Sequence, residues 1–127
     1  MRTVNATEEP DLAMALRGSG SQFGIATGYN VKAYPMGKVW GGMRTYHESK
    51  AEEIFAALHN FVPKNAEDED AAVILTELIA FGQSRFFLLF YYYGEPEPPT
   101  TGPFAQFLNI DPAIDNTKTQ SYAELVS

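Results

Sequence analysis

The sequence contains no cysteine, only two histidines and no apolar run near the roughly 18 residues that a membrane-spanning helix needs. Without cysteine there is no disulfide, thiolate metal site or cysteine nucleophile. Two isolated histidines among dispersed acids form no transition-metal ligand set, so we predict no metal site. The N-terminal residues include Glu8, Glu9 and Asp11 where a signal peptide would be apolar. We therefore expect no membrane association and a cytoplasmic protein.

Basic residues are also scarce. The chain has 9 Lys and Arg against 16 Asp and Glu, which gives a net charge of -7. Nucleic acids bind proteins through clustered Lys and Arg, so no nucleic-acid partner is expected. A hydrophobic fraction of 45% over 127 residues is enough for a folded core. This charge balance accommodates a neutral or cationic small molecule more easily, and the partner that we expect is a small hydrophobic or aromatic substrate.

The first third of the chain shows both helical and alternating patterns. Residues 1–10 alternate weakly, as a strand would, and Pro10 opens a short helix that ends at Gly18. From Phe23 to Tyr34, the odd positions form the more apolar face. This alternation predicts a second strand, which Pro35 stops.

From Lys38 onward the patterns predict strand, helix, strand, strand and helix. The first strand covers residues 38–47, and Gly41 with Gly42 indicates a bulge or a close approach. Ser49 and Glu52 match a capping box before an amphipathic helix that ends at Pro63. Residues 71–81 and 85–93 read as a hairpin at the centre of the sheet, and residues 103–108 as a short helix.

This order is most of a ferredoxin-like unit that lacks its last strand. The expected fold class is α+β: an antiparallel sheet with helices on one face, an incomplete ferredoxin-like βαββα unit preceded by a helix and a strand. The apolar sequence of residues 71–93 leaves sheet surface that needs a cover. A homodimer that exchanges residues 23–34 or the C-terminal tail would complete the sheet.

Three glycines, Gly18, Gly20 and Gly24, form the most specific feature of the chain. Glycine permits positive φ, and the amides between the glycines could bind an anion. The order is helix, turn, strand, whereas a dinucleotide fingerprint needs strand, turn, helix, so that interpretation fails. A structural turn and a ligand loop both remain open from the pattern alone.

Several segments together resemble one block of the FAD-linked oxidases, of the berberine-bridge-like or vanillyl-alcohol-oxidase type found in fungal secondary metabolism. These segments are Asn5–Leu12, Ala15–Gly18, Phe23–Thr27 and Tyr34–Pro35 with Gly37–Gly42. The resemblance implies that residues 1–36 are the end of a flavin domain and residues 37–127 the first half of a substrate domain, within one compact domain overall. The chain is then a truncated slice of such an enzyme.

The same resemblance bears on the cofactor. In that family, flavin is attached through a histidine upstream of this block, sometimes with a cysteine, and neither His47 nor His59 has a matching context. We therefore expect no cofactor. If FAD is bound, the resemblance implies contacts from Gly18, Gly20, Gln22, Phe23 and Gly24.

Two residues are candidates for proton transfer. Glu77 interrupts an apolar strand face, and burial there would raise the pKa of its carboxyl group. His47 ends the first strand of the sheet and could act as a general base. A salt-bridged Glu77 and a solvent-exposed His47 are the structural alternatives.

An aromatic surface on the first sheet strand is the candidate binding site. Trp40, Arg44 and Tyr46 share one face of this strand, where Arg44 or Tyr46 could hold an oxyanion. Ordinary core packing explains the same pattern. The further substrate-binding candidates are Tyr91, Phe87 and Met43.

Three functions follow as hypotheses. The first is a flavin-free enzyme derived from FAD-linked oxidases, which uses acid and base groups to cyclise or isomerise a secondary metabolite. The second is a fragment of an FAD-dependent oxidoreductase that needs a partner chain for its missing flavin lobe. The third is a non-catalytic binding or assembly module.

Overall fold

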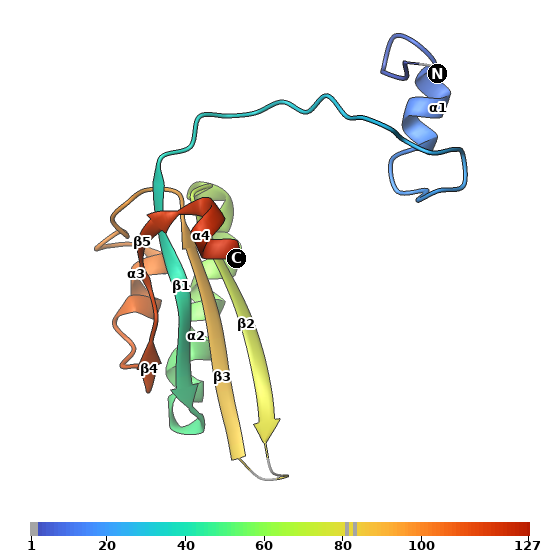
Figure 1. Ribbon diagram of the computed structural model, residues 1–127. Helices are drawn as coiled ribbons and strands as arrows, with labels where there is room; N and C mark the ends of the chain where they lie inside the picture. The colour runs from blue at the N-terminus through green and yellow to red at the C-terminus, as the bar shows by residue number, and fades with distance from the viewer. Residues whose placement is uncertain (1–2, 81, 83) are drawn as a thin grey trace. The chain divides into compact units, whose positions relative to one another are not determined.

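The computed structural model describes residues 3–80, 82 and 84–127, which divide into two units at residues 34 and 35 (Figure 1). The resemblance to FAD-linked oxidases implies a boundary two residues later, between 36 and 37. The first unit contains one helix, α1 (Pro10–Ala15), followed by turns and an extended stretch. All regular sheet structure lies in the second unit, residues 35–127.

The two strands predicted before residue 35 are not formed. Residues 5–9 are bends, and residues 24–34 are exposed and carry no strand assignment; residues 1 and 2 lie outside the described part of the chain. A strand needs backbone hydrogen bonds to a neighbouring strand, and none of the described strands pairs with this region. An alternating sequence therefore was not sufficient to form a strand.

The second unit is built on one antiparallel sheet. Its strands are β1 (Lys38–His47), β2 (Ala71–Ala80), β3 (Ser84–Tyr93), β4 (Ile114–Asp115) and β5 (Lys118–Ser121). The order is β2-β3-β1, with β4 and β5 both paired to the other side of β1. The predicted α+β class is confirmed, and β4 with β5 takes the place of the last ferredoxin-like strand.

The predicted hairpin forms, but its position differs from expectation. β3 lies between β1 and β2, whereas β2 is an edge strand. The prediction that both hairpin strands are central was therefore wrong for β2. Apolar side chains on a strand report contacts above and below the sheet and carry no information about its edges.

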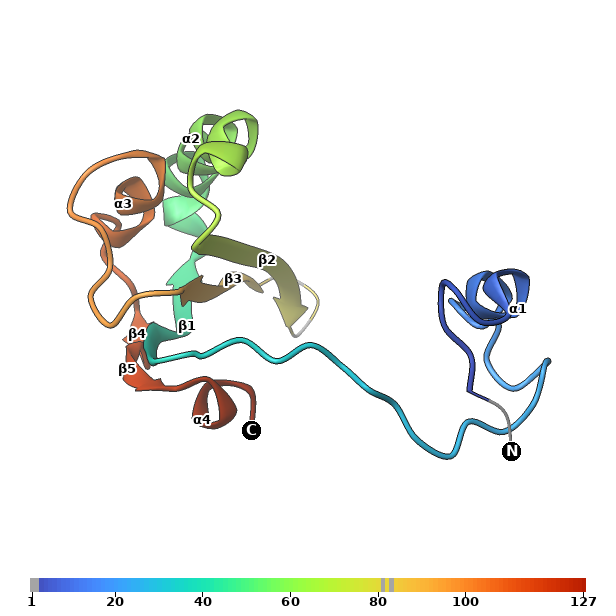
Figure 2. The ribbon, with the colours of Figure 1, turned by 90° about the horizontal axis from the view of Figure 1, so that it is seen from above.

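Helices α2 (Ala51–Phe61) and α3 (Pro103–Leu108) pack against one face of the sheet, while α4 (Tyr122–Val126) lies on the opposite side (Figure 2). The predicted capping box at Ser49 is absent, because a 3₁₀ turn at Glu48–Lys50 precedes α2. A capping box instead begins α4, where Ser121 and Glu124 hydrogen-bond each other's backbone amides.

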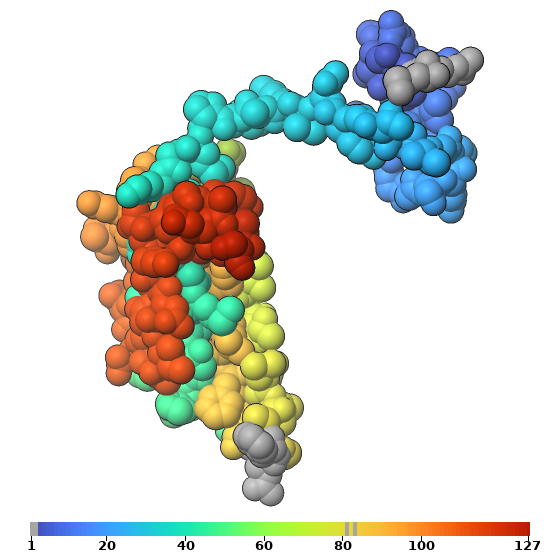
Figure 3. All heavy atoms as spheres, viewed as in Figure 1, coloured from blue at the N-terminus to red at the C-terminus, as the bar shows by residue number. Residues whose placement is uncertain are grey.

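The core lies between the sheet and helices α2 and α3. Its largest fully buried side chains are mostly aromatic: Tyr46, Tyr91, Phe87, Phe104, Phe107, Ile54, Leu89 and Val39, although Val39 points away from this layer. On the other side of the strands, α4 covers one end of the sheet, where a β-carbon on Gly41 would meet Leu125. Below α4, side chains of the strands reach the surface (Figure 3).

We call this surface the open face, because α2 and α3 do not cover it. It consists of alternate residues of the three long strands, namely Met43, Ile74, Leu78, Phe86, Leu88 and Phe90. Met43, Ile74 and Leu78 are more than two-fifths exposed. The sheet therefore has one packed side and one apolar side that is largely in contact with water.

Candidate functional site

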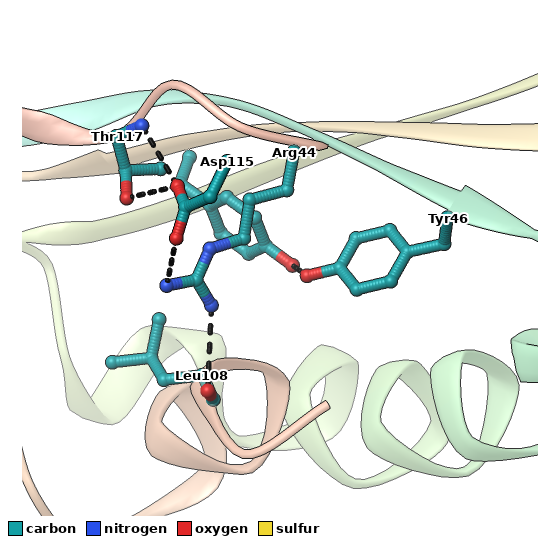
Figure 4. Close-up of polar contacts among 6 residues, drawn as sticks. Arg44, Tyr46, Leu108, Asp115 and Thr117 are labelled. Carbon is teal, nitrogen blue, oxygen red and sulfur yellow. Dashed lines mark hydrogen bonds and ion pairs between the residues drawn. The ribbon is translucent and has the colours of Figure 1, made fainter. Parts of the chain in front are cut away.

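Arg44 lies in the middle of β1, on the side of the sheet that faces α2 and α3. Its Nη2 atom forms an ion pair with Asp115 Oδ2 at 2.8 Å, and Nη1 donates to the carbonyl oxygen of Leu108 at 3.3 Å (Figure 4). The guanidinium carbon is 5.9 Å from the ring centre of Trp40 and 5.7 Å from that of Tyr91. Arg44 thus connects β1 to β4 and to the C-terminal end of α3.

Tyr46 and Tyr91 form a buried phenol pair beside Arg44. The two hydroxyl oxygens are 2.9 Å apart, and neither residue is exposed to solvent. One hydroxyl donates to the other, so each of the two phenol oxygens has a hydrogen-bond partner inside the aromatic core. This explains how two tyrosines can occupy the centre of the sheet.

Charges of opposite sign stabilise each other in this cluster. Burial alone lowers the pKa of Arg44, but the hydrogen bond and charge of Asp115 outweigh it, so the net pKa is raised. Burial raises the pKa of Asp115, yet hydrogen bonds from Thr117 and Arg44 lower it overall. Burial, together with the hydrogen bond to Tyr46, raises the pKa of Tyr91. All three groups therefore keep their ordinary charge states at neutral pH.

The structure brings five of the predicted residues to one side of the sheet. Arg44 and Tyr46 lie with the predicted substrate-binding residues Trp40, Phe87 and Tyr91. Four of these five are buried in helix-to-sheet packing, and Arg44 is 12% exposed. The shared face predicted for Trp40, Arg44 and Tyr46 is confirmed.

The other predicted residues lie elsewhere. Met43 and His47 are on the opposite face of β1, and both are exposed. His47 contacts the ring of Phe86, with ring centres 5.8 Å apart. The sheet thus separates His47 from Arg44 and Tyr46.

Glu77 lies near the far end of the edge strand β2. Its side chain is 37% exposed and forms an ion pair with Arg85 of β3, so the condition of burial for a raised pKa is not met. Arg85 also bonds Glu48 at 3.3 Å. This is the salt-bridged alternative, and it agrees with the place of β2 at the edge of the sheet, since Phe87, the partner of Glu77 on β3, is fully buried.

Asp115 and the Leu108 carbonyl were missed in the sequence. Asp115 follows an unpatterned loop, and a two-residue strand gives no periodic signal. The only local sequence motif at Asp115 is Asp-Asn-Thr, in which Asp115 Oδ1 accepts from the amide and hydroxyl of Thr117. This motif predicts a turn, but it does not predict the ion pair with Arg44.

The glycine segment belongs to the first unit. Gly18, Gly20 and Gly24 have φ of +99°, +61° and +140°, and a β-carbon at any of them would meet no atom within 4 Å. Gln22 and Phe23 are exposed. Within the described residues nothing packs on these glycines, so their open backbone is accessible to another group.

Comparison with known proteins identifies the relatives of this chain. It is 34% identical over 125 residues to an FAD-linked oxidoreductase of Arthroderma benhamiae, covering 97% of this chain and 24% of that protein. It is 33% identical over 112 residues to an FAD-dependent monooxygenase of Phaeosphaeria nodorum, covering 84% of this chain and 33% of that protein. A third relative is a bifunctional solanapyrone synthase of Alternaria solani, 31% identical over 67 residues.

The chain spans only a quarter to a third of the lengths of the first two relatives. No family model and no solved structure matches it. The homologues are fungal FAD-linked oxidoreductases and FAD-dependent monooxygenases, and the resemblance to a slice of such enzymes is confirmed.

None of the helices in the described part of the chain has the length and apolar character required to cross a bilayer. The cytoplasmic location stays a prediction.

Proposed function

We propose that this chain is the substrate-side part of an FAD-linked oxidoreductase of fungal secondary metabolism. The observation that carries the proposal is the open face of the sheet. An apolar surface of this kind suits a hydrophobic or aromatic small molecule. Similarity along 97% of the chain to an FAD-linked oxidoreductase supplies the reaction class.

FAD would be held mainly by protein outside this slice. The only described residues that suit a flavin contact are those of the glycine segment, where open backbone lets a planar or anionic group approach. Gln22 and Phe23 lie in the same exposed segment. When bound, FAD supplies the electron transfer, while the residues of this chain bind and orient the substrate.

Arg44 acts as a positioning residue in this proposal. Its guanidinium group lies on the packed side of β1, so it does not reach a molecule on the open face. By joining β1 to Asp115 and to the Leu108 carbonyl, it fixes the strand that presents Met43 to that face. The hydrogen bond between Tyr46 and Tyr91 likewise holds β1 in place by joining it to β3.

The flavin-free cyclase or isomerase has less support. That reaction needs a proton-transfer group and an oxyanion-binding group to meet at one substrate. His47 is separated from Arg44 and Tyr46 by the sheet, and Glu77 is engaged by Arg85. No observation brings these four residues to a common site.

The experiment is a split-protein assembly. The FAD-linked oxidoreductase of Arthroderma benhamiae is expressed without the segment that matches this chain, together with this chain carrying an affinity tag. The expected result is a purified complex that shows the visible absorbance of bound flavin. The positive control supplies the relative's own segment as the separate tagged chain.

Two outcomes oppose the proposal. One is that the relative's own segment assembles a flavin-containing complex while this chain does not. The other is a visible flavin spectrum from the purified chain alone, which would show that it needs no further flavin-binding lobe.

A further inference from the structure

Residues 24–34 have the sequence of a strand, yet none of the described strands pairs with them. Residues 24–34 are extended and exposed, and Ile25, Tyr29 and Val31 are 91%, 80% and 81% exposed. These residues alternate with small or polar ones. An apolar alternating segment of this length gains stability only by pairing with a sheet edge.

The second unit offers such an edge. β2 pairs with β3 on one side, and no described strand pairs with its other side. Over ten residues it contains no proline and no lysine, the usual devices that prevent edge pairing. Ile74 and Leu78 on this strand are 60% and 47% exposed.

We propose that residues 23–32 of one copy pair antiparallel with β2 of a second copy, in a reciprocal strand-exchanged dimer. One register fits both sequences. It sets Ile25 opposite Leu78, Thr27 opposite Thr76 and Tyr29 opposite Ile74. Apolar and Thr–Thr cross-strand pairs of this kind stabilise antiparallel sheets.

The same register also suits the side chains on the other face of the sheet. On that face it sets Ala26 opposite Glu77 and Gly28 opposite Leu75, so small residues meet larger ones. Lys32 falls opposite Ala71, next to the acidic run of residues 67–70. The apolar odd positions of the donor segment therefore extend the open face.

Charge also favours this pairing. Residues 17–34 contain Arg17 and Lys32 and no acid, whereas residues 35–127 contain thirteen acidic and six basic residues. A basic donor segment and an acidic sheet unit attract each other, most strongly at low salt.

Pairing of the donor segment with β2 of its own chain is geometrically demanding in this register. Six residue steps join Lys32 to Lys38, and fully extended they span about 20 Å. They would have to cross three strand spacings of about 4.8 Å and turn a corner at each end, with the φ of Pro35 fixed. A second copy removes this restriction.

The test uses the natural absence of cysteine. Two single variants, Ile25→Cys and Leu78→Cys, are purified separately, mixed and oxidised. Opposed residues in antiparallel strands have Cα atoms about 4.5–5.5 Å apart, within the disulfide range. We expect a covalent dimer from the mixture and little from either variant alone. The matched control replaces Leu78→Cys by Glu77→Cys, whose side chain points to the other face, and should not cross-link.

A second measurement needs no cross-link. Sedimentation equilibrium of the unmodified chain should give a dimer. Gly94 N donates to Asp70 O, so the even residues of β2 bond to β3 and the odd residues present the free edge. Ala26 is opposite Glu77, so Ala26→Pro removes a strand donor and should shift the dimer to monomer. Ala26 is exposed, so Trp40 fluorescence should stay unchanged in this variant. A chain that is monomeric at every concentration, a series of higher oligomers, or equal cross-linking to Cys at 77 and 78 would each overturn the proposal. These outcomes do not depend on flavin, so they are separate from the test of the proposed function.

Discussion

Removing the carboxylate from the Arg44–Asp115 pair should cost more stability than removing the cation. Thr117 bonds Oδ1 of Asp115 and Arg44 pairs with Oδ2, so in Asp115→Asn one of these two positions becomes an NH2 donor and one partner loses its acceptor. The Arg44 charge is then left between two aromatic rings with one carbonyl acceptor. In Arg44→Met, the apolar side chain still packs, and Asp115 keeps its bonds from Thr117.

The expected losses of unfolding free energy follow from the exposure of the Arg44 and Asp115 side chains. Breaking a fully buried pair costs about 3–5 kcal/mol, whereas an exposed pair contributes about 0–1 kcal/mol. Arg44 is 12% exposed and Asp115 is 38% exposed, so this pair lies between these limits. We expect a loss of about 1.5–2.5 kcal/mol for Asp115→Asn and about 0.5–1 kcal/mol for Arg44→Met, on the basis of the same limits.

The assay is urea unfolding followed by fluorescence of Trp40, the single tryptophan, which is 8% exposed and packs against Phe104. The double variant should lose less than the sum of the two single losses, because removing both charges leaves neither one unpaired. Equal losses in the two single variants, or a larger loss for Arg44→Met, would refute this account of the cluster.

The pH dependence of the unfolding free energy provides an independent check of the same pair. Folding lowers the pKa of Asp115 below its ordinary value of 3.8, so its stabilising contribution is present above that pH and is lost as pH falls through the folded value. The difference in unfolding free energy between the natural chain and Asp115→Asn should be constant near neutral pH and shrink below pH 3.8. A difference that stays the same in acid would contradict the charge-based explanation.

The remaining predictions concern the phenol pair, a crowded glycine and the exposed carboxylate. Tyr46→Phe should lower stability by about 1–2 kcal/mol by leaving the Tyr91 hydroxyl unpaired, and Tyr91→Phe added to it should restore part of the loss in the same urea assay. Gly42→Ala should prevent β4 and β5 from docking, since its φ is +141° and a β-carbon would lie 2.5 Å from the Asn116 carbonyl oxygen; loss of amide protection in hydrogen exchange measures this. Glu77→Gln should change the free energy of unfolding by less than about 0.5 kcal/mol, because its ion pair is exposed; a larger change would show that the pair supports the hairpin.

Strand and helix positions in the second unit could be read from the sequence. β1, β2, β3, α2 and α3 all arise where side-chain periodicity is strong, and their observed bounds agree closely with the predicted ones. Alternation on β1 also placed Trp40, Arg44 and Tyr46 on one face. Periodicity works here because burial on one side of a strand or helix is a local property of the chain.

Other features depend on residues far apart in the sequence. Gly41 and Gly42 were read as a bulge or a close approach; the register of β1 with β3 is continuous, and the backbone at Asn116 and Thr117 is what approaches Gly42. The sequence left a buried and a salt-bridged Glu77 both open, and the place of β2 at the edge of the sheet gives the salt-bridged one. A single strand cannot report whether it lies at the centre or the edge of its sheet.

By itself, the sequence determined the α+β class, the bounds of the long strands and the relationship to FAD-linked oxidases, because periodicity and motif identity are properties of neighbouring residues. Only the tertiary structure decided that β2 is an edge strand, that residues 23–34 form no strand, and that Asp115 binds Arg44. Each of these depends on which segments meet across the fold, and hydrogen bonds and ion pairs between distant segments leave no pattern in either segment alone.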